Sequence, residues 1–132
     1  MLYVESSALM KLYRPEHDSE FTLHTVATEP LRVTCGITEV EVRRNLVRHF
    51  DGEELARVQR QLQVDLTAFE MVELDAEVCV DAARIAEETL CRSLDAIHLA
   101  AARRASPYAT VLTFDRRQAE AARAIGMAVL GA

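Results

Sequence analysis

The fold is most clearly indicated by residues 93–118, SLDAIHLAAARRASPYATVLTFDRRQ. Residues 93–105 are apolar nearly all round a helical repeat, so they predict a helix that is buried on most sides. A short apolar strand at 111–114 follows and ends in Asp115, which stands directly before a further predicted helix. A buried helix set between strands is typical of a domain in which helices cover both faces of a parallel sheet.

The rest of the chain repeats this alternation of short strands and helices. Further strands are expected at 2–5, 31–34, 71–74 and 127–130. Further helices are expected at 7–13, 19–28, 37–50, 76–90 and 116–125, with an amphipathic stripe from Leu55 to Phe69. Strands joined by helices need crossover connections, so the sequence predicts an α/β fold with a mainly parallel sheet.

Length and composition suit one domain, residues 1–132, without a linker or a low-complexity segment. The three cysteines, Cys35, Cys79 and Cys91, lack paired metal-ligand spacing, so we expect small buried thiols of a reduced compartment. No apolar run approaches the length of a membrane span, and no secretory signal precedes the first strand. The expectation is a soluble cytoplasmic protein that does not contact a membrane.

The net charge of −6 opposes nucleic-acid binding by the surface as a whole. Basic residues nevertheless gather in three places: Arg43, Arg44 and Arg48; Arg103 and Arg104; Arg116, Arg117 and Arg123. Each cluster alone is typical of a solvated helix face. Contact with an RNA backbone is the alternative for these clusters.

Four acids stand out, because ligands of parallel sheets bind at the carboxyl ends of the strands. Glu5 ends the first predicted strand and Asp115 follows the fourth, while Glu41 and Asp95 begin helices. Each has a purely structural explanation as well. Thr38-x-x-Glu41 is a capping-box pattern, Asp115 with Gln118 is another, and Asp95 suits the positive end of a helix dipole.

Asp95 fits the structural explanation least well. An acid in so apolar a helix is expected to be partly buried and to need a partner. His98, one turn later, is the expected partner, and a packing or supporting role for His98 is favoured over metal ligation.

Carboxylates gathered at one edge repel one another unless protons or cations neutralise them. Mg²⁺ and Mn²⁺ take such oxygen ligands, activate water and hold a phosphodiester for in-line attack. The sequence has no glycine-rich phosphate loop with lysine, no G-x-S-x-G motif and no convincing Ser-His-Asp set. Ser6 and Ser7 are more simply expected to cap the first helix.

The whole chain resembles the PIN-domain family, and within it the VapC-type toxins of bacterial toxin–antitoxin pairs. The matching stretches are YVESSALMKLYRPE, TEVEVRRNL, RSLDAIHLAAA and LTFDRRQAEAARAIGM. The resemblance implies a three-layer sandwich with a central five-stranded parallel sheet. It also implies an Mg²⁺- or Mn²⁺-dependent endoribonuclease that forms a homodimer and is inhibited by a VapB-type antitoxin.

The resemblance also implies roles for particular residues. The site acids are Glu5, Glu41, Asp95 and Asp115; Glu41 matches better than Glu39 because it directly precedes the apolar-Arg-Arg segment. The implied metal ligands are Glu5, Asp95 and Asp115, supported by Ser7, Thr113 and His98. The implied RNA contacts are Arg43, Arg44, Arg116 and Arg117.

Glu5 departs from the family pattern, which has Asp at this position. The extra methylene moves the carboxylate by about 1.5 Å, one bond length. Glu5→Asp is expected to raise activity if the longer side chain misplaces the ion, and to lower it if the backbone compensates. The alternatives are a weakly active or silent PIN-like module that binds antitoxin or RNA and, more remotely, a phosphatase, which would want a D-x-D that VESSA lacks.

Overall fold

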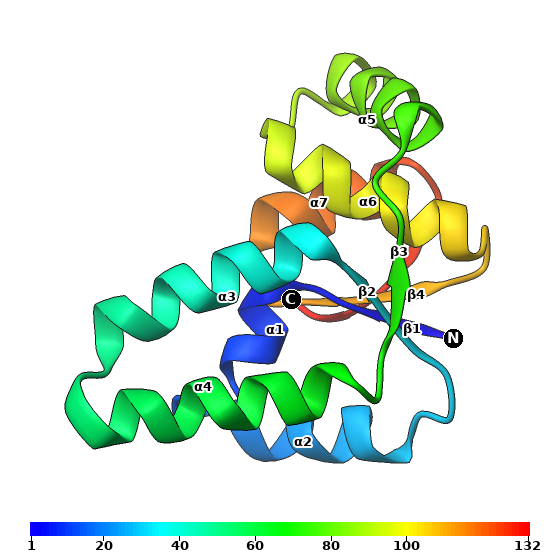
Figure 1. The fold of residues 1–132 in the computed structure, drawn as a ribbon. Helices are drawn as coiled ribbons and strands as arrows, with labels where there is room; N and C mark the ends of the chain where they lie inside the picture. Colours follow the sequence, from blue (N-terminus) through cyan, green and yellow to red (C-terminus); the bar gives the residue numbers. More distant parts are fainter.

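Five parallel strands form the central sheet of the computed structural model, which describes residues 1–132 (Figure 1). The strand order is β3-β2-β1-β4-β5. The strands are β1 (Leu2–Val4), β2 (Arg32–Cys35), β3 (Glu70–Val72), β4 (Thr110–Thr113) and β5 (Ala128–Gly131). The first strand of the sequence therefore lies at the centre of the sheet, and the predicted parallel α/β fold is confirmed.

Helices cover both faces of the sheet, which gives three layers (Figure 1). The helices are α1 (Ser6–Met10), α2 (Ser19–Thr28), α3 (Gly36–His49), α4 (Gly52–Leu66), α5 (Ala76–Thr89), α6 (Ser93–Ala105) and α7 (Arg116–Ala124). In β1 the side chains alternate between the two faces. Leu2 and Val4 pack in the core beneath α1 to α4, and Tyr3 packs in the core beneath α5 to α7.

The predicted burial of the helix at 93–105 is confirmed. In α6, Leu99 and the three alanines that follow it are almost inaccessible to solvent. The helix is held beneath α5 by apolar packing and by ion pairs from its last turn, Arg103 to Asp81 and Arg104 to Glu77, each at 2.6 Å. This packing fixes the first turn of α6, which carries Asp95, beside the centre of the sheet.

Helices α3 and α4 run side by side and extend away from the sheet (Figure 1). The amphipathic stripe predicted from Leu55 to Phe69 places Val58 and Leu62 in the core against α3. The first turns of α3, which carry Glu41, lie next to α1 and the carboxyl ends of the central strands.

The predicted boundaries match the observed ones at both ends of α2 and α6 and differ by at most three residues elsewhere. The first helix is the shortest, because Lys11 to Arg14 continue in tight turns instead of α-helix. The expectation of three buried thiols is wrong for two of them. Cys35 is buried, but Cys79 is exposed on the outer face of α5 and Cys91 is partly exposed in the loop after it. None of the helices has the length and the apolar character that a membrane crossing would need.

Candidate functional site

Two of the four expected site acids, Glu5 and Asp115, lie at the carboxyl ends of the central strands β1 and β4. In the parallel register Val4 of β1 pairs with Leu112 of β4, so Glu5 and Thr113 follow side by side. The hydroxyl of Thr113 donates to Oε2 of Glu5 at 3.1 Å, and the backbone N–H of Asp115 donates to the same hydroxyl at 3.1 Å. Thr113 therefore links the acid that ends the first strand to the acid that follows the fourth.

Glu5 is only 6 % exposed, and its carboxylate caps α1. Oε2 accepts from the backbone N–H of Ser7 at 2.9 Å and from the Ser7 hydroxyl at 2.5 Å. The expectation that Ser6 and Ser7 cap this helix is wrong, because Glu5 is the capping acceptor and Ser7 is its donor. Free helix N–H groups and hydroxyls make a near-buried carboxylate tolerable at this strand end.

Glu41 reaches the same region from α3. Its Oε1 accepts from the Ser6 hydroxyl at 2.7 Å and from Nε2 of His98 at 2.5 Å. The capping-box interpretation of Thr38 and Glu41 is wrong, because α3 begins earlier, at Gly36, and the Thr38 hydroxyl accepts from Thr34 inside the core. Glu39 points elsewhere and pairs with Arg43 on the surface.

His98 is the buried partner of this carboxylate. Its Nδ1 lies 2.9 Å from the hydroxyl of Tyr3, which donates its only proton to Sγ of Cys35 at 3.0 Å. Nδ1 must therefore donate to Tyr3, while Nε2 donates to Glu41, so both ring nitrogens carry protons.

Charges in the network agree with this protonation. Burial favours the neutral imidazole, but hydrogen bonds to Cys35 and Glu41 and the charge of Glu5 outweigh it and raise the pKa of His98 to about 10. Burial likewise opposes the charge of Glu41, yet the bond to His98 holds the pKa of that carboxyl below its usual range. An imidazolium with both nitrogens engaged has no lone pair for a metal, which agrees with a supporting role.

Asp95 and Asp115 form a second group around Arg92. Nε of Arg92 donates to Asp95 at 2.8 Å, and Nη2 donates both to Asp95, at 3.2 Å, and to Asp115. The expectation that His98 partners Asp95 is wrong. Both nitrogens of His98 are taken by Glu41 and Tyr3, whereas Arg92 stands just before the helix and reaches its first turn.

Asp115 is the N-cap of α7, as its position predicted. Its Oδ1 accepts from the backbone N–H groups of Arg117, at 2.9 Å, and Gln118, at 3.2 Å. The Gln118 side chain does not return the bond and is buried without a partner. Partial burial alone would raise the pKa of the Asp115 carboxyl. The Gln118 backbone amide and the Arg92 guanidinium have the larger combined effect and lower that pKa below its usual value, so the group is ionised.

The site thus consists of two neighbouring groups. Oxygen or nitrogen atoms of Glu5, Glu41 and His98 lie within 4.8 Å of one another. In the other group, carboxylate oxygens of Asp95 and Asp115 face one nitrogen of Arg92, which marks a shared position for a cation. Carboxylate oxygens are the ligands that Mg²⁺ and Mn²⁺ prefer, so this donor set fits a hard divalent ion.

Arg92, Ser6 and Tyr3 were not predicted from the sequence as site residues. Arg92 offered one signal, its position three residues before Asp95, which is a favourable spacing for an ion pair at a helix start. Tyr3 gave none, because its partners lie on other strands and helices.

The arginines expected to contact RNA lie on two helices. Arg116 and Arg117 are exposed on the first turn of α7, directly after Asp115, and Arg43 and Arg44 are exposed on α3. The Arg103 and Arg104 pair is instead engaged with acids of α5.

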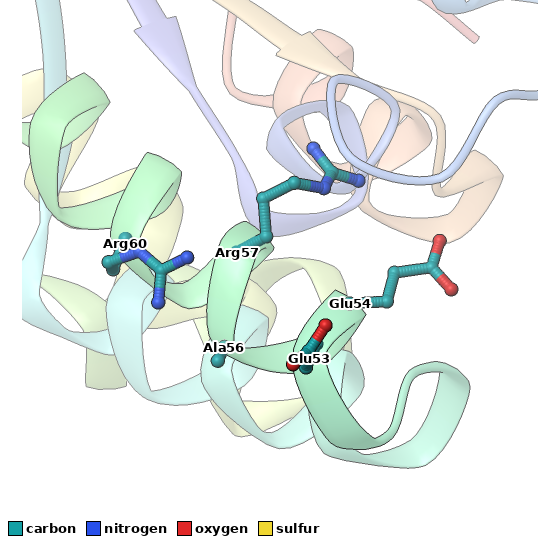
Figure 2. Close-up of a pocket in the computed structure, with 5 residues that line it drawn as sticks. All are labelled: Glu53, Glu54, Ala56, Arg57 and Arg60. Atoms are coloured by element: carbon teal, nitrogen blue, oxygen red, sulfur yellow. The ribbon is translucent and has the colours of Figure 1, made fainter.

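Three surface depressions differ in how close they lie to the site acids. One of about 480 Å³ involves no site acid, and Figure 2 shows its lining residues on adjoining turns of α4. A second, of about 460 Å³, is bordered by Arg92 and Arg117 and so adjoins the second acidic group. A third, of about 300 Å³, is an apolar groove between the end of α1, α2 and α4.

Fold and site together define the class of protein: a parallel α/β domain with acidic side chains gathered at the carboxyl ends of its central strands. The family model described as the PIN domain matches residues 2–124, and the chain belongs to this family. It is 38% identical over 135 aligned positions to Ribonuclease VapC35 of Mycobacterium tuberculosis, covering 98% of this chain and 96% of that relative.

Solved structures share the fold. FitAcB from Neisseria gonorrhoeae superimposes with a TM-score of 0.79 at 20% identity, covering 98% of this chain and 96% of that one. A chain of a toxin-antitoxin complex from Klebsiella pneumoniae superimposes with a TM-score of 0.74 at 16% identity, covering 98% and 96%.

Proposed function

We propose that the protein is a metal-dependent endoribonuclease and the toxin of a VapBC-type toxin–antitoxin pair. The observation that carries the proposal is the pairing of Asp95 and Asp115 on one guanidinium nitrogen, because the two carboxyl groups there share one position for a cation. Glu5 stands beside them through Thr113. A relative of 38% identity over nearly the whole chain, named a ribonuclease, supports the reaction class.

In this proposal Glu5, Asp95 and Asp115 hold the ion, which when bound activates water and neutralises charge at the scissile phosphate. Thr113 and Ser7 fix the Glu5 carboxylate, and His98 and Ser6 keep Glu41 ionised and oriented. Water attacks phosphorus and the bond from phosphorus to the 3′ oxygen breaks, so one product carries a 5′-phosphate and the other keeps the 3′ oxygen as a 3′-hydroxyl.

The proposed RNA contacts flank these acids. Arg116 and Arg117 follow Asp115 directly on α7, and Arg43 and Arg44 lie on α3 shortly after Glu41. Local positive charge is needed there, because the chain as a whole is acidic.

The apolar groove is the proposed binding site of an amphipathic antitoxin helix. Leu12, Tyr13, Leu23 and Val26 line it, and Leu23 is 60 % exposed without a partner of its own. The groove has an apolar wall along α2 and a polar edge, Gln61 and Asp65, on α4, which matches recognition of an amphipathic helix in a groove. An arginine of the antitoxin could then pair with the site acids, and the homodimer implied by the resemblance belongs to the same proposal.

A catalytically silent module is the second candidate, and one observation favours it. Oε2 of Glu5 already accepts three hydrogen bonds, from the N–H and hydroxyl of Ser7 and the hydroxyl of Thr113. Only Oε1, which lies 4.0 Å from Nε2 of His98, remains for an ion.

The test is cleavage of a structured RNA by the purified protein in EDTA, and after addition of Mg²⁺ or Mn²⁺. The proposal predicts cleavage only with a divalent ion, and 5′-phosphate ends on the products. Cleavage that persists in EDTA would refute the metal-dependent mechanism. Absence of cleavage with either metal, in protein freed of antitoxin and across a panel of cellular RNAs, would favour the silent module.

A further inference from the structure

We propose that Arg92 is a built-in competitor of the metal ion. Its guanidinium occupies the cation position shared by Asp95 and Asp115, and it must release both carboxylates before an ion can bind them. The inference rests on the proposed metal-dependent function and adds a residue that sets how tightly the ion is held.

The geometry of Arg92 resembles that of a bound cation. The two aspartates come from different helices, Asp95 from the first turn of α6 and Asp115 from the N-cap of α7, yet both accept from Nη2. The Asp95 side chain is only 8 % exposed, so its charge needs a counter-charge whenever no ion is present. Arg92 supplies that charge from within the chain.

Arg92 differs from His98, the other cation of the site, in its freedom to leave. The Arg92 side chain is 57 % exposed, and its known bonds are to the two aspartates. His98 is about 1 % exposed and is held at both ring nitrogens. The site therefore contains one fixed cation, beside Glu5 and Glu41, and one displaceable cation, between the two aspartates.

The neighbouring depression offers a place for the displaced guanidinium. It is bordered by Arg92 itself and also contains Glu88 and Glu120. Both glutamates can accept hydrogen bonds, so we expect the released guanidinium to pair with one of them in this depression.

An ion and the guanidinium cannot share these carboxylates. Mg²⁺ holds its oxygen ligands at about 2.1 Å in octahedral geometry, and a second positive charge within hydrogen-bond distance of the same oxygens would repel it. Metal binding therefore carries the cost of breaking the Arg92 pairs. Because those pairs are partly exposed, the cost is modest. We expect them to weaken metal binding by roughly three- to tenfold, which corresponds to the free energy of one good surface ion pair.

The experiment is a calorimetric titration of the metal-free protein with Mn²⁺, comparing the natural chain with Arg92→Gln, Arg92→Lys and Arg117→Gln. Arg117 borders the same depression, but only its backbone contacts Asp115, so its variant removes an equal charge without removing a carboxylate bond. The expected result is Mn²⁺ binding roughly three- to tenfold tighter in Arg92→Gln, with less than twofold change in Arg117→Gln. Arg92→Lys keeps the charge without the planar fork and should lie between them.

The melting temperature, measured without and with Mn²⁺, is a second readout. Without Mn²⁺, Arg92→Gln should melt at a lower temperature than the natural protein, because Asp95 loses its counter-charge, and Mn²⁺ should raise its melting temperature more. Unchanged or weaker Mn²⁺ affinity in Arg92→Gln would overturn the inference while leaving the proposed function intact. Failure of every protein in the series, including the natural one, to bind Mn²⁺ would overturn the proposed metal site and this inference with it.

Discussion

The hydroxyl of Thr113 donates to Oε2 of Glu5 at 3.1 Å, although 108 positions separate the two residues. This bond joins the ends of the two central strands. Together with the N–H and hydroxyl of Ser7, this bond holds the carboxylate at the distance from the backbone that a glutamate side chain reaches. The longer acid is therefore built into the site, which favours compensation by the surroundings over a misplaced ligand.

Glu5→Asp should consequently lower ribonuclease activity. Aspartate is a good N-cap, so α1 should persist, but the carboxylate would retract by about 1.5 Å from Thr113 and from the ion. Misplacement of a reacting group by about 1 Å costs on the order of a hundredfold in rate. Cleavage rates of one RNA with Mg²⁺ and with Mn²⁺ measure the effect. A tenfold gain in Glu5→Asp would show instead that the longer side chain misplaces the ion.

His98 should make stability depend on pH. Its pKa is raised in the folded state, to about 10, so its contribution is fully present below the unfolded value near 6.5 and is lost as pH rises through 10. His98→Gln should cost about 3 kcal/mol at pH 6, as expected for breaking a buried ion pair, and progressively less at pH 8 and pH 10. Urea unfolding at the three pH values measures this, with the exposed His24→Gln as control. A cost that is constant across this range would contradict a charged His98.

The Tyr3 hydroxyl should contribute to stability through the same network. Tyr3→Phe removes the acceptor of the Nδ1–H of His98 and the donor to Cys35 inside the core. Leaving a buried donor unsatisfied costs about 1–3 kcal/mol of unfolding free energy. Tyr108→Phe, at a tyrosine that is 90 % exposed, is the matched control and should be neutral. Equal unfolding free energies of the two variants in urea would show that the Tyr3 hydroxyl does not contribute to stability.

The antitoxin groove can be tested at its rim. Leu23→Asp places a charge on the groove wall without disturbing the core, because Leu23 is already largely exposed. Loss of one buried leucine contact, about 1.5–3 kcal/mol, should weaken binding of the purified antitoxin roughly tenfold to a hundredfold. Val80→Asp, at a comparably exposed position on α5 across the sheet, should bind normally. Unchanged affinity in Leu23→Asp would place the antitoxin elsewhere.

Local patterns predicted the fold well because they report burial. The apolar run at 93–105 predicted the buried helix α6, and the apolar residues at three- and four-residue steps from Leu55 to Leu66 predicted one face of α4. Phe69, the last residue of the predicted stripe, lies in the turn after α4 and still packs in the core. Glu41 was preferred over Glu39 as a site acid from the sequence, and the structure places Glu41 against Ser6 and His98, whereas Glu39 pairs with Arg43 on the surface.

Side-chain partners were less predictable, because they depend on the packing of distant elements. His98 is spaced to meet Asp95 on an isolated helix, but α3 and β1 bring Glu41 and Tyr3 to its ring first. Arg92 reaches two acids only because α7 begins beside α6. Cys79 was expected to be buried from residue type alone, yet it falls on the outer face of α5.

The most direct test of the account is cleavage of one RNA, with Mn²⁺, by the natural protein, Asp115→Asn and Asp75→Asn. Both aspartates are helix N-caps, Asp115 of α7 and Asp75 of α5, and asparagine caps as well as aspartate, so both variants should remain folded. Only Asp115 lies in the acidic site. We expect Asp115→Asn to cut at least about a hundredfold more slowly, since the charge of a metal ligand is lost, while Asp75→Asn cuts at the natural rate. Cleavage by Asp115→Asn as fast as by Asp75→Asn would contradict it.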